Sequence, residues 1–360
     1  MIYNCSTEMM AFLNEKVRLS KIDKDNLRGY RDTNLTRLTN GLAKNGDPAY
    51  KKWISQGSYA MNTINQHPDN DYDLDIGMIF NKANLVGKQG ADKSALEARK
   101  MVSKAMQDDR FKKPPEVLKN CVRVYYDEGH HIDMPVYRTC EKDGKIIQEL
   151  ASTDWKDSDP ESITSWYNNA VIEQSPDTNN GRQMRRVTRL GKSFMNSRAS
   201  WNMPSGFMFS VLVDELYVKI LGRDDESLYQ TLKAIRDRLR WNKNVHNPVN
   251  GDLISEGKEA QLIKLHDELD FHLTNTLYIL EHNSCTEEQA LKAWSKFFKD
   301  EFFKDKIVKA KIAEDSSLSN LAMLGLGVVA GAATVAVASA LNNKDDEYEI
   351  KETQKPWLRS

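Results

Sequence analysis

The strongest constraint on this chain is the run DYDLDIGMIF at residues 71–80, in which three alternating aspartates lead into an apolar stretch. The alternation and the β-branched and aromatic content predict a β-strand. Side chains two positions apart in a strand share a face, so Asp73 and Asp75 project together. Like charges on one face repel, and a chain tolerates them where a cation lies between them or where water covers them. Asp71 precedes the strand, which favours a turn or cap role for it.

A third aspartate lies on a second predicted strand. Asp133 stands in HHIDMPVYR at 130–138, and CVRVYYD at 121–127 precedes it, so the two strands are predicted to form a hairpin. Two carboxylates on one strand and one on its neighbour can hold two Mg²⁺ ions about 4 Å apart. The alternative is a solvated strand edge whose acids share no role. Because Mg²⁺ prefers oxygen ligands, His130 and His131 are assigned to the turn and the strand entry.

A glycine-serine turn lies fifteen residues ahead of the Asp-x-Asp strand, in the sequence SQGSYA. Gly57 lets a backbone approach a phosphate closely, and Ser58 offers a hydroxyl. The short helix predicted at 59–64 presents free N–H groups, which suit an anion. Such a turn alone is a frequent accident, but together with the strand acids it predicts a site that binds a triphosphate beside metal ions.

The remaining pattern divides the chain into a mixed α/β lobe and an all-helical lobe. Helices are predicted over residues 6–46 and roughly 92–108, and a strand at 145–150. From about residue 160 the chain is helical, with predicted helices at 159–174, 180–201, 204–221, 224–241, 256–282 and 286–312. We therefore predict an α+β fold with a helix-and-sheet lobe (1–159), a helical lobe (160–315), and an apolar segment with a polar tail (316–360).

Charge is balanced over the chain, with a formal net charge of -1. This balance argues against binding of a long nucleic acid, so any phosphate-handling site must be local. A basic cluster on the helix predicted at 180–201 is expected to form a solvated or acid-facing surface. Its members are Arg182, Arg185, Arg186 and Arg189.

The cysteines and the N-terminus indicate a cytoplasmic catalytic part. The four cysteines, Cys5, Cys121, Cys140 and Cys285, form no CxxC pair, which fits neither a zinc site nor a disulfide framework. Charged residues interrupt the apolar residues of the N-terminus too early for a signal peptide.

The sequence LAMLGLGVVAGAATVAVASAL at 321–341 carries no charge. As a helix it would rise about 31 Å, close to the hydrocarbon thickness of a bilayer. A lysine-rich stretch precedes it, so a spanning segment would keep the N-terminal part in the cytoplasm. Its Gly, Ala and Val content equally suits a packed or partner-facing helix, so membrane contact and a soluble role both remain open.

Six stretches resemble one family in order and sequence. They are SQGSYAMNTI, DYDLDIG, HHIDMPVY, DWKDSDPESITSWYN, RRVTRLGKSFMNSR and MPSGFMFSVLVDEL, and the resemblance covers roughly residues 50–260. The order of motifs, Gly-Ser followed by Asp-x-Asp and a later Asp, resembles the signature of the nucleotidyltransferase superfamily. Within it, the chain is most similar to the bacterial cGAS-like cyclic-oligonucleotide synthases (CD-NTases), in the branch of the bacterial cyclic GMP-AMP synthases. The resemblance implies a polymerase β-like nucleotidyltransferase lobe.

The resemblance also implies roles for individual residues. The metal-binding and catalytic acids would be Asp73, Asp75 and Asp133. The donor-phosphate loop would be Gln56, Gly57 and Ser58. Further nucleotide contacts would come from Arg123 in CVRVYY, Lys192 in RLGKSF, Ser205 in MPSGF, and Asp252 in the loop HNPVNGDLISEG.

By resemblance the chain would be a Mg²⁺-dependent enzyme with two ions, for which Mn²⁺ may substitute. It would join nucleoside triphosphates such as ATP and GTP into a cyclic di- or trinucleotide for anti-phage (CBASS) signalling through a downstream effector. Relatives are coupled to a ubiquitin-like conjugation system through the C-terminus, but KPWLRS lacks the small-residue ending expected for this. Transfer of one nucleotide to a small molecule, a protein or an RNA end, and a non-catalytic binding module, are the alternatives.

Overall fold

The computed structural model describes residues 1–66, 73–87, 90–127, 129–198 and 202–308. The chain begins with helix α1 (Ser6–Phe12), which continues as a π-helical turn over Leu13–Val17. Helix α2 (Lys21–Asn45) then starts afresh, because the backbone is extended at Arg18 and the Ser20 side chain accepts the Asp23 N–H as an N-cap. The prediction of one helix over 6–46 is therefore wrong at this break.

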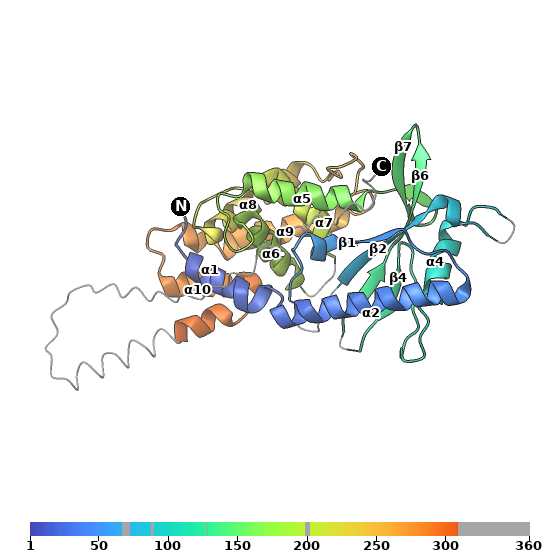
Figure 1. Cartoon of the computed structure of the whole chain (residues 1–360). Helices are drawn as coiled ribbons and strands as arrows, with labels where there is room; N and C mark the ends of the chain where they lie inside the picture. Colours follow the sequence, from blue (N-terminus) through green and yellow to red (C-terminus); the bar gives the residue numbers. More distant parts are fainter. Residues whose placement is uncertain (67–72, 88–89, 128, 199–201, 309–360) are drawn as a thin grey trace.

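A mixed sheet forms the first lobe (Figure 1). Over the described residues it has eight strands: β1 (Lys52–Gln56), β2 (Asp73–Asn81), β3 (Glu116–Val117), β4 (Val122–Tyr125), β5 (His131–Met134), β6 (Val136–Lys142), β7 (Lys145–Ala151) and β8 (Trp155–Asp157). Strand β2 is central, since it pairs with β1 in antiparallel fashion and with β5 and β6 in parallel. The predicted hairpin is confirmed as the antiparallel pair β4–β5.

The predicted strand at 130–138 is interrupted once, at Pro135. Its two parts keep one register along β2, with Asp75 opposite Asp133 and Met78 opposite Val136. The Met78 N–H donates to the Pro135 carbonyl (2.8 Å), so the ladder on this side continues. Proline has no N–H to offer on the other side, and there β5 pairs with β4 while β6 pairs with β7.

Helices α2 and α4 (Ala95–Ala105) cover one face of this sheet. Alternate residues of β2, Leu74, Ile76, Met78 and Phe80, are fully buried in the hydrophobic cluster that these helices share. Ile79 instead packs with Ile54 and Tyr137 in a small separate cluster. The alternation of β2 therefore directs Asp73 and Asp75 to the face that α2 and α4 leave uncovered.

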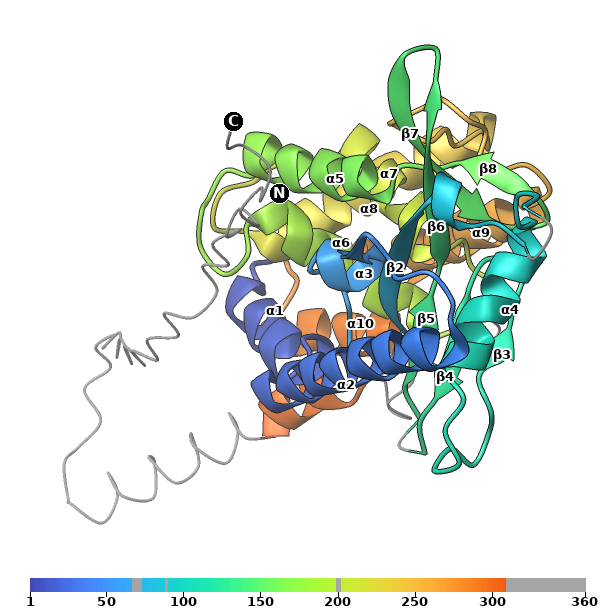
Figure 2. The ribbon, with the colours of Figure 1, turned by 45° about the vertical axis from the view of Figure 1, so that its right-hand side comes forward.

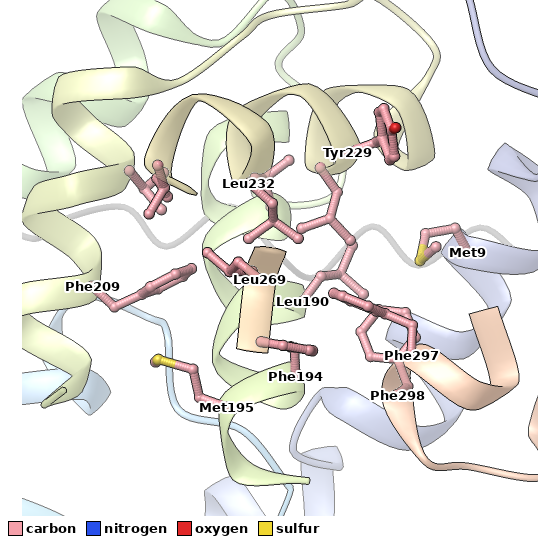
Figure 3. Packing of buried hydrophobic residues seen from close by; sticks show 14 of the residues in the cluster. Met9, Leu190, Phe194, Met195, Phe209, Tyr229, Leu232, Leu269, Phe297 and Phe298 are labelled. Carbon is pink, nitrogen blue, oxygen red and sulfur yellow. The ribbon is translucent and has the colours of Figure 1, made fainter. Parts of the chain in front are cut away.

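The second lobe is helical, as predicted. It contains α5 (Pro160–Gln174), α6 (Gln183–Asn196), α7 (Gly206–Leu216), α8 (Asp224–Trp241), α9 (Glu259–Asn275), a 3₁₀ turn (Tyr278–Glu281) and α10 (Glu287–Phe298). Phe194 of α6 stacks on Phe297 of α10 with 4.3 Å between ring centroids, and Figure 3 shows Met9 of α1 in the same core. Residues 2–17 thus pack with the helical core, and we propose a lobe boundary near residue 159 that assigns this N-terminal segment to the helical side.

Within the part of the chain that the structure describes, no helix combines the length and apolar character needed to cross a bilayer. The apolar segment 321–341, and all of 316–360, lie outside the described residues.

Candidate active site

The acidic residues meet where β2 and β5 run side by side. Register places Asp73 opposite His131 and Asp75 opposite Asp133. The side chains of Ile132 and Met134 are buried in the core below the sheet, which turns Asp133 to the same face as the β2 acids. One ligand atom from each of Asp73, His131 and Asp133 lies within 4.8 Å of the others.

Asp75 lies beside this cluster and is half-buried. Burial raises its pKa to about 7, and the negative charges of Asp133 and Asp73 add to the effect. Acidic neighbours oppose the ionisation of this carboxyl, so a cation bound beside it would stabilise its ionised form. The repulsion expected from the alternating acids is therefore present in the fold.

The glycine-serine turn closes over Asp75. Gln56, the last residue of β1, is opposite Asp75 in the sheet, and the short helix α3 (Gly57–Ala60) follows immediately. Gly57 has a φ of 67°, and a Cβ built on it would lie 2.1 Å from Asp75 Oδ2. Only glycine fits here, for both backbone and steric reasons. The helix predicted at 59–64 is shorter than expected and begins at the glycine itself.

Arg123 contacts the acids directly. Its Nε and Nη2 donate to Asp133 Oδ1 and Oδ2, both at 2.7 Å, and Nη2 is 3.9 Å from Asp73 Oδ1. This bidentate pair holds the Asp133 carboxylate in one orientation. A nucleotide contact for Arg123 stays a prediction, and its position beside the acids is compatible with it.

His131 is the first residue of β5, so its assignment as a strand-entry residue is confirmed, and its side chain also joins the site. Its Nε2 contacts Asp73 Oδ1. Burial lowers the pKa of His131, but the contact with the Asp73 carboxylate outweighs burial and leaves the pKa raised. The sequence contained the necessary signal, because His131 is two residues before Asp133 on the same strand and therefore shares its face.

Lys192 reaches the same region from the helical lobe. Its Nζ donates to the Thr63 carbonyl (2.9 Å), three residues past α3. Burial and the charge of Arg189 lower its pKa to about 8, against a smaller raising effect of Asp73. Ser205 precedes Gly206, and a Cβ built on Gly206 would lie 3.0 Å from Lys192 Cε. The Ser205 hydroxyl caps α7.

Asp252 is placed differently from the other candidate residues. It lies in an exposed loop, where its carboxylate accepts from the Asn250 side chain (2.8 Å). Its hydrogen bonds in the described part of the chain stay within this loop. The structure thus gathers eight of the ten candidates around the acids and α3, places Ser205 beside Lys192 at the start of α7, and leaves Asp252 in a loop of the helical lobe.

The basic cluster on α6 is not solvated at Arg186 and Arg189, so that alternative is wrong for them, whereas Arg186 faces acids, as the second alternative expected. Arg186 and Arg189 are each 3% exposed. Arg186 pairs with Asp177 (2.6 Å) and Asp224 (2.5 Å) inside the helical lobe. Removing one partner of such a buried pair would leave an uncompensated buried charge, which is strongly destabilising.

The donor set fits a divalent metal ion. Asp73 and Asp133, with His131, lie close enough together to share one ion, and Asp75 adds a third carboxylate opposite Asp133. Carboxylate oxygens are the ligand type that Mg²⁺ and Mn²⁺ prefer. Arg123 occupies one lone-pair site on each oxygen of Asp133, so each oxygen keeps a second site that can face a cation.

Comparisons with known proteins agree with this geometry. Residues 51–137 match the family described as "Cyclic GMP-AMP synthase DncV-like, nucleotidyltransferase domain". This segment contains β1, α3, β2 and β5, and therefore all three acids and the glycine-serine turn.

Solved structures match most of the chain. The Vibrio cholerae DncV cyclic AMP-GMP synthase, in complex with the linear intermediate 5' pppA(3',5')pG, superimposes with a TM-score of 0.65 at 16% identity, covering 83% of this chain and 96% of that one. The 3'-deoxy ATP bound form gives 0.64 at 16% identity, covering 82% and 95%. Escherichia coli DncV, 3'-deoxy GTP bound, gives 0.59 at 17% identity, covering 79% and 93%. At this identity the likeness establishes a shared fold, and the matched segment identifies the domain. Residues 51–137 therefore match a DncV-like nucleotidyltransferase domain, which indicates a nucleotidyltransferase enzyme, and the chain as a whole shares the fold of the DncV structures.

Proposed function

We propose that this chain is a cyclic-oligonucleotide synthase that uses Mg²⁺, or Mn²⁺ in its place, to join nucleoside triphosphates including ATP. The observation that carries the proposal is the position of Asp75, which lies between the Gly57 backbone on one side and Asp133 on the neighbouring strand. This arrangement puts a phosphate-binding turn against an acidic cluster. A synthase of similar fold is described with a linear pppApG intermediate, and related forms with ATP and GTP analogues.

In this proposal each group of residues has its own role. Gln56, Gly57 and Ser58 would line the triphosphate, and Lys192 would exchange the Thr63 carbonyl for a phosphate oxygen. Asp73, Asp75 and Asp133 would hold the cations, with Arg123 and His131 orienting two of these carboxylates. Bound divalent cations would promote ionisation of the attacking sugar hydroxyl and neutralise the departing pyrophosphate.

The proposed reaction forms one phosphodiester at a time. A 2′- or 3′-hydroxyl oxygen of one nucleotide bonds to the α-phosphorus of another, the α–β phosphoanhydride breaks, and pyrophosphate leaves with its electron pair. The hydroxyl proton passes to solvent. The same step, repeated between the two ends of the linear product, closes the ring and releases a second or third pyrophosphate.

We further propose that the product acts as a second messenger in anti-phage (CBASS) signalling and that a separate effector reads it. Membrane contact through 321–341, and a conjugation or regulatory partner at the C-terminus, are independent of catalysis, because all the site residues lie before residue 260.

Product analysis tests the proposal. The purified full chain is incubated with Mg²⁺ or Mn²⁺ and α-labelled NTPs, singly and in pairs, and the products are treated with phosphatase. A phosphatase-resistant species with the mass of a cyclic di- or trinucleotide is expected. Label on a small molecule, a protein or an RNA end would show single-nucleotide transfer instead. NTP binding without turnover under every metal would show a non-catalytic module.

A further inference from the structure

Three basic side chains of α6 hold three consecutive backbone carbonyls of the nucleotidyltransferase lobe. Arg185 Nε donates to the Met61 carbonyl (3.1 Å), Arg189 Nε to the Asn62 carbonyl (3.0 Å), and Lys192 Nζ to the Thr63 carbonyl (2.9 Å). Positions 185, 189 and 192 are one helical turn apart and form a single stripe on α6. The stripe thus links the helical lobe to the segment 61–63.

This segment is bonded directly to the phosphate-binding turn. The Met61 N–H donates to the Gly57 carbonyl (3.1 Å), and the Thr63 N–H donates to the Ser58 carbonyl (2.8 Å). Figure 2 shows α3, which Gly57 begins, between the sheet and the helical lobe. A shift of segment 61–63 would therefore move Gly57 and Ser58 against Asp75.

Arg189 makes the most specific of the three contacts. Asn62 has a φ of 51°, a left-handed conformation that ends α3 and that side chains other than Asn and Gly rarely adopt. Arg189 donates to both the Asn62 carbonyl and its Oδ1 (2.8 Å), and the Asn65 side chain donates back to the Arg189 carbonyl (2.8 Å). Arg189 is 3% exposed and Asn65 8%, so water competes little for these bonds.

We propose that Arg189, acting through Asn62, is a positioning residue that fixes the Gly57–Ser58 turn and thereby sets the affinity for the NTP phosphates. This inference rests on the proposed function, because that function assigns the turn to the triphosphate. Arg189 itself need not touch the nucleotide.

The test measures the Kd for ATP with Mg²⁺, together with KM and kcat, in the full-length chain. Arg189→Gln should weaken ATP binding and raise KM roughly tenfold, the scale of one lost charge-assisted hydrogen bond. Arg189→Lys should recover part of this loss, because lysine can satisfy one of the two Asn62 oxygens. Arg238→Gln is the matched control, since Arg238 also donates to carbonyls, those of Asn242 and Asn244, but within the helical lobe.

Asn62→Gly provides a second variant that keeps the left-handed turn and removes only the Oδ1 contact. A severalfold weaker ATP affinity is expected for it. A fall in kcat at unchanged KM and Kd in both variants would mean fewer folded molecules and would overturn the positioning role. If the wild-type chain binds ATP but makes no product, only the proposed function is refuted. The ratio of each variant's Kd for ATP to that of the wild type still decides the role of Arg189. A wild-type chain that binds no ATP would refute both.

Discussion

The Gly57 backbone lies against the Asp75 carboxylate so closely that a Cβ on Gly57 would come within 2.1 Å of Asp75 Oδ2. The two residues come from separate motifs, a turn after β1 and the first half of β2, and antiparallel pairing of these strands brings them together. The glycine-serine turn and the acidic cluster are therefore one structural unit, and a change in either should displace the other.

Gly57→Ala tests this unit. The added methyl group must displace Asp75 or the turn, so nucleotidyl transfer should fall on the order of a hundredfold, the scale expected when reacting groups are misplaced by about an ångström. Gly46→Ala is the control, because Gly46 has a similar φ of 70° with nothing within 4 Å of its Cβ position. Both variants should lose roughly 1 kcal/mol of stability from backbone strain. Steady-state rates and thermal unfolding check the pair, and equal activity in both would contradict the close contact.

The charge of Lys192 predicts the alkaline limb of the pH profile. Burial lowers its pKa to about 8, so the ammonium that would bind phosphate is lost as the pH rises through that value. The wild-type kcat/KM for NTP should therefore decline above about pH 8. Lys192→Arg, which stays protonated, should lack this decline. An identical decline in both proteins would show that another group is responsible.

His272 predicts an acid-sensitive helical lobe. Burial, with a contribution from Arg198, lowers its pKa from 6.5 to about 4, and its ring packs edge-on against Phe194 and Phe297. Between these two pH values the unfolded chain binds more protons than the folded chain, so stability falls as the pH falls. From pH 7 to pH 5 this group alone should cost about 2 kcal/mol.

Urea unfolding at the two pH values measures this contribution. His272→Gln should reduce the loss of unfolding free energy between pH 7 and pH 5 by that amount. His282→Gln, at an exposed histidine, is the matched control. If the loss in His272→Gln equals that of the wild type, the buried histidine is not the source.

Much of the site followed from strand alternation. The spacing of Asp73 and Asp75 was sufficient to place both on one face, and the apolar neighbours of Asp133 were sufficient to orient it. The same rule places His131 on this face, whereas the preference of Mg²⁺ for oxygen ligands argues against His131 as a ligand. Strand alternation depends only on residues that are close in the sequence, so it predicts side-chain direction before the fold is known.

Other features depend on tertiary contacts that periodicity cannot contain. A basic stripe on a helix has the same sequence pattern whether it faces water or backbone carbonyls, and only the packing of the two lobes turns Arg189 toward Asn62. The break before α2 involves only a few residues around Ser20, but serine also occurs inside helices, so the residue type does not predict the break. The Ser20 cap forms because the chain turns there between two cores. The exposed position of Asp252 likewise reflects the loop geometry rather than its residue type.

Pyrophosphate release from ATP and GTP with Mg²⁺, compared between wild type and Asp75→Asn, tests the central claim most directly. Asparagine keeps the shape that packs on Gly57 and removes the charge, and Asp237→Asn, at an exposed acid on α8, is the matched control. The wild type and Asp237→Asn should release pyrophosphate at the same rate, and Asp75→Asn should be slower on the order of a thousandfold. Release by Asp75→Asn at the wild-type rate would contradict the assignment of this acidic cluster as the catalytic centre.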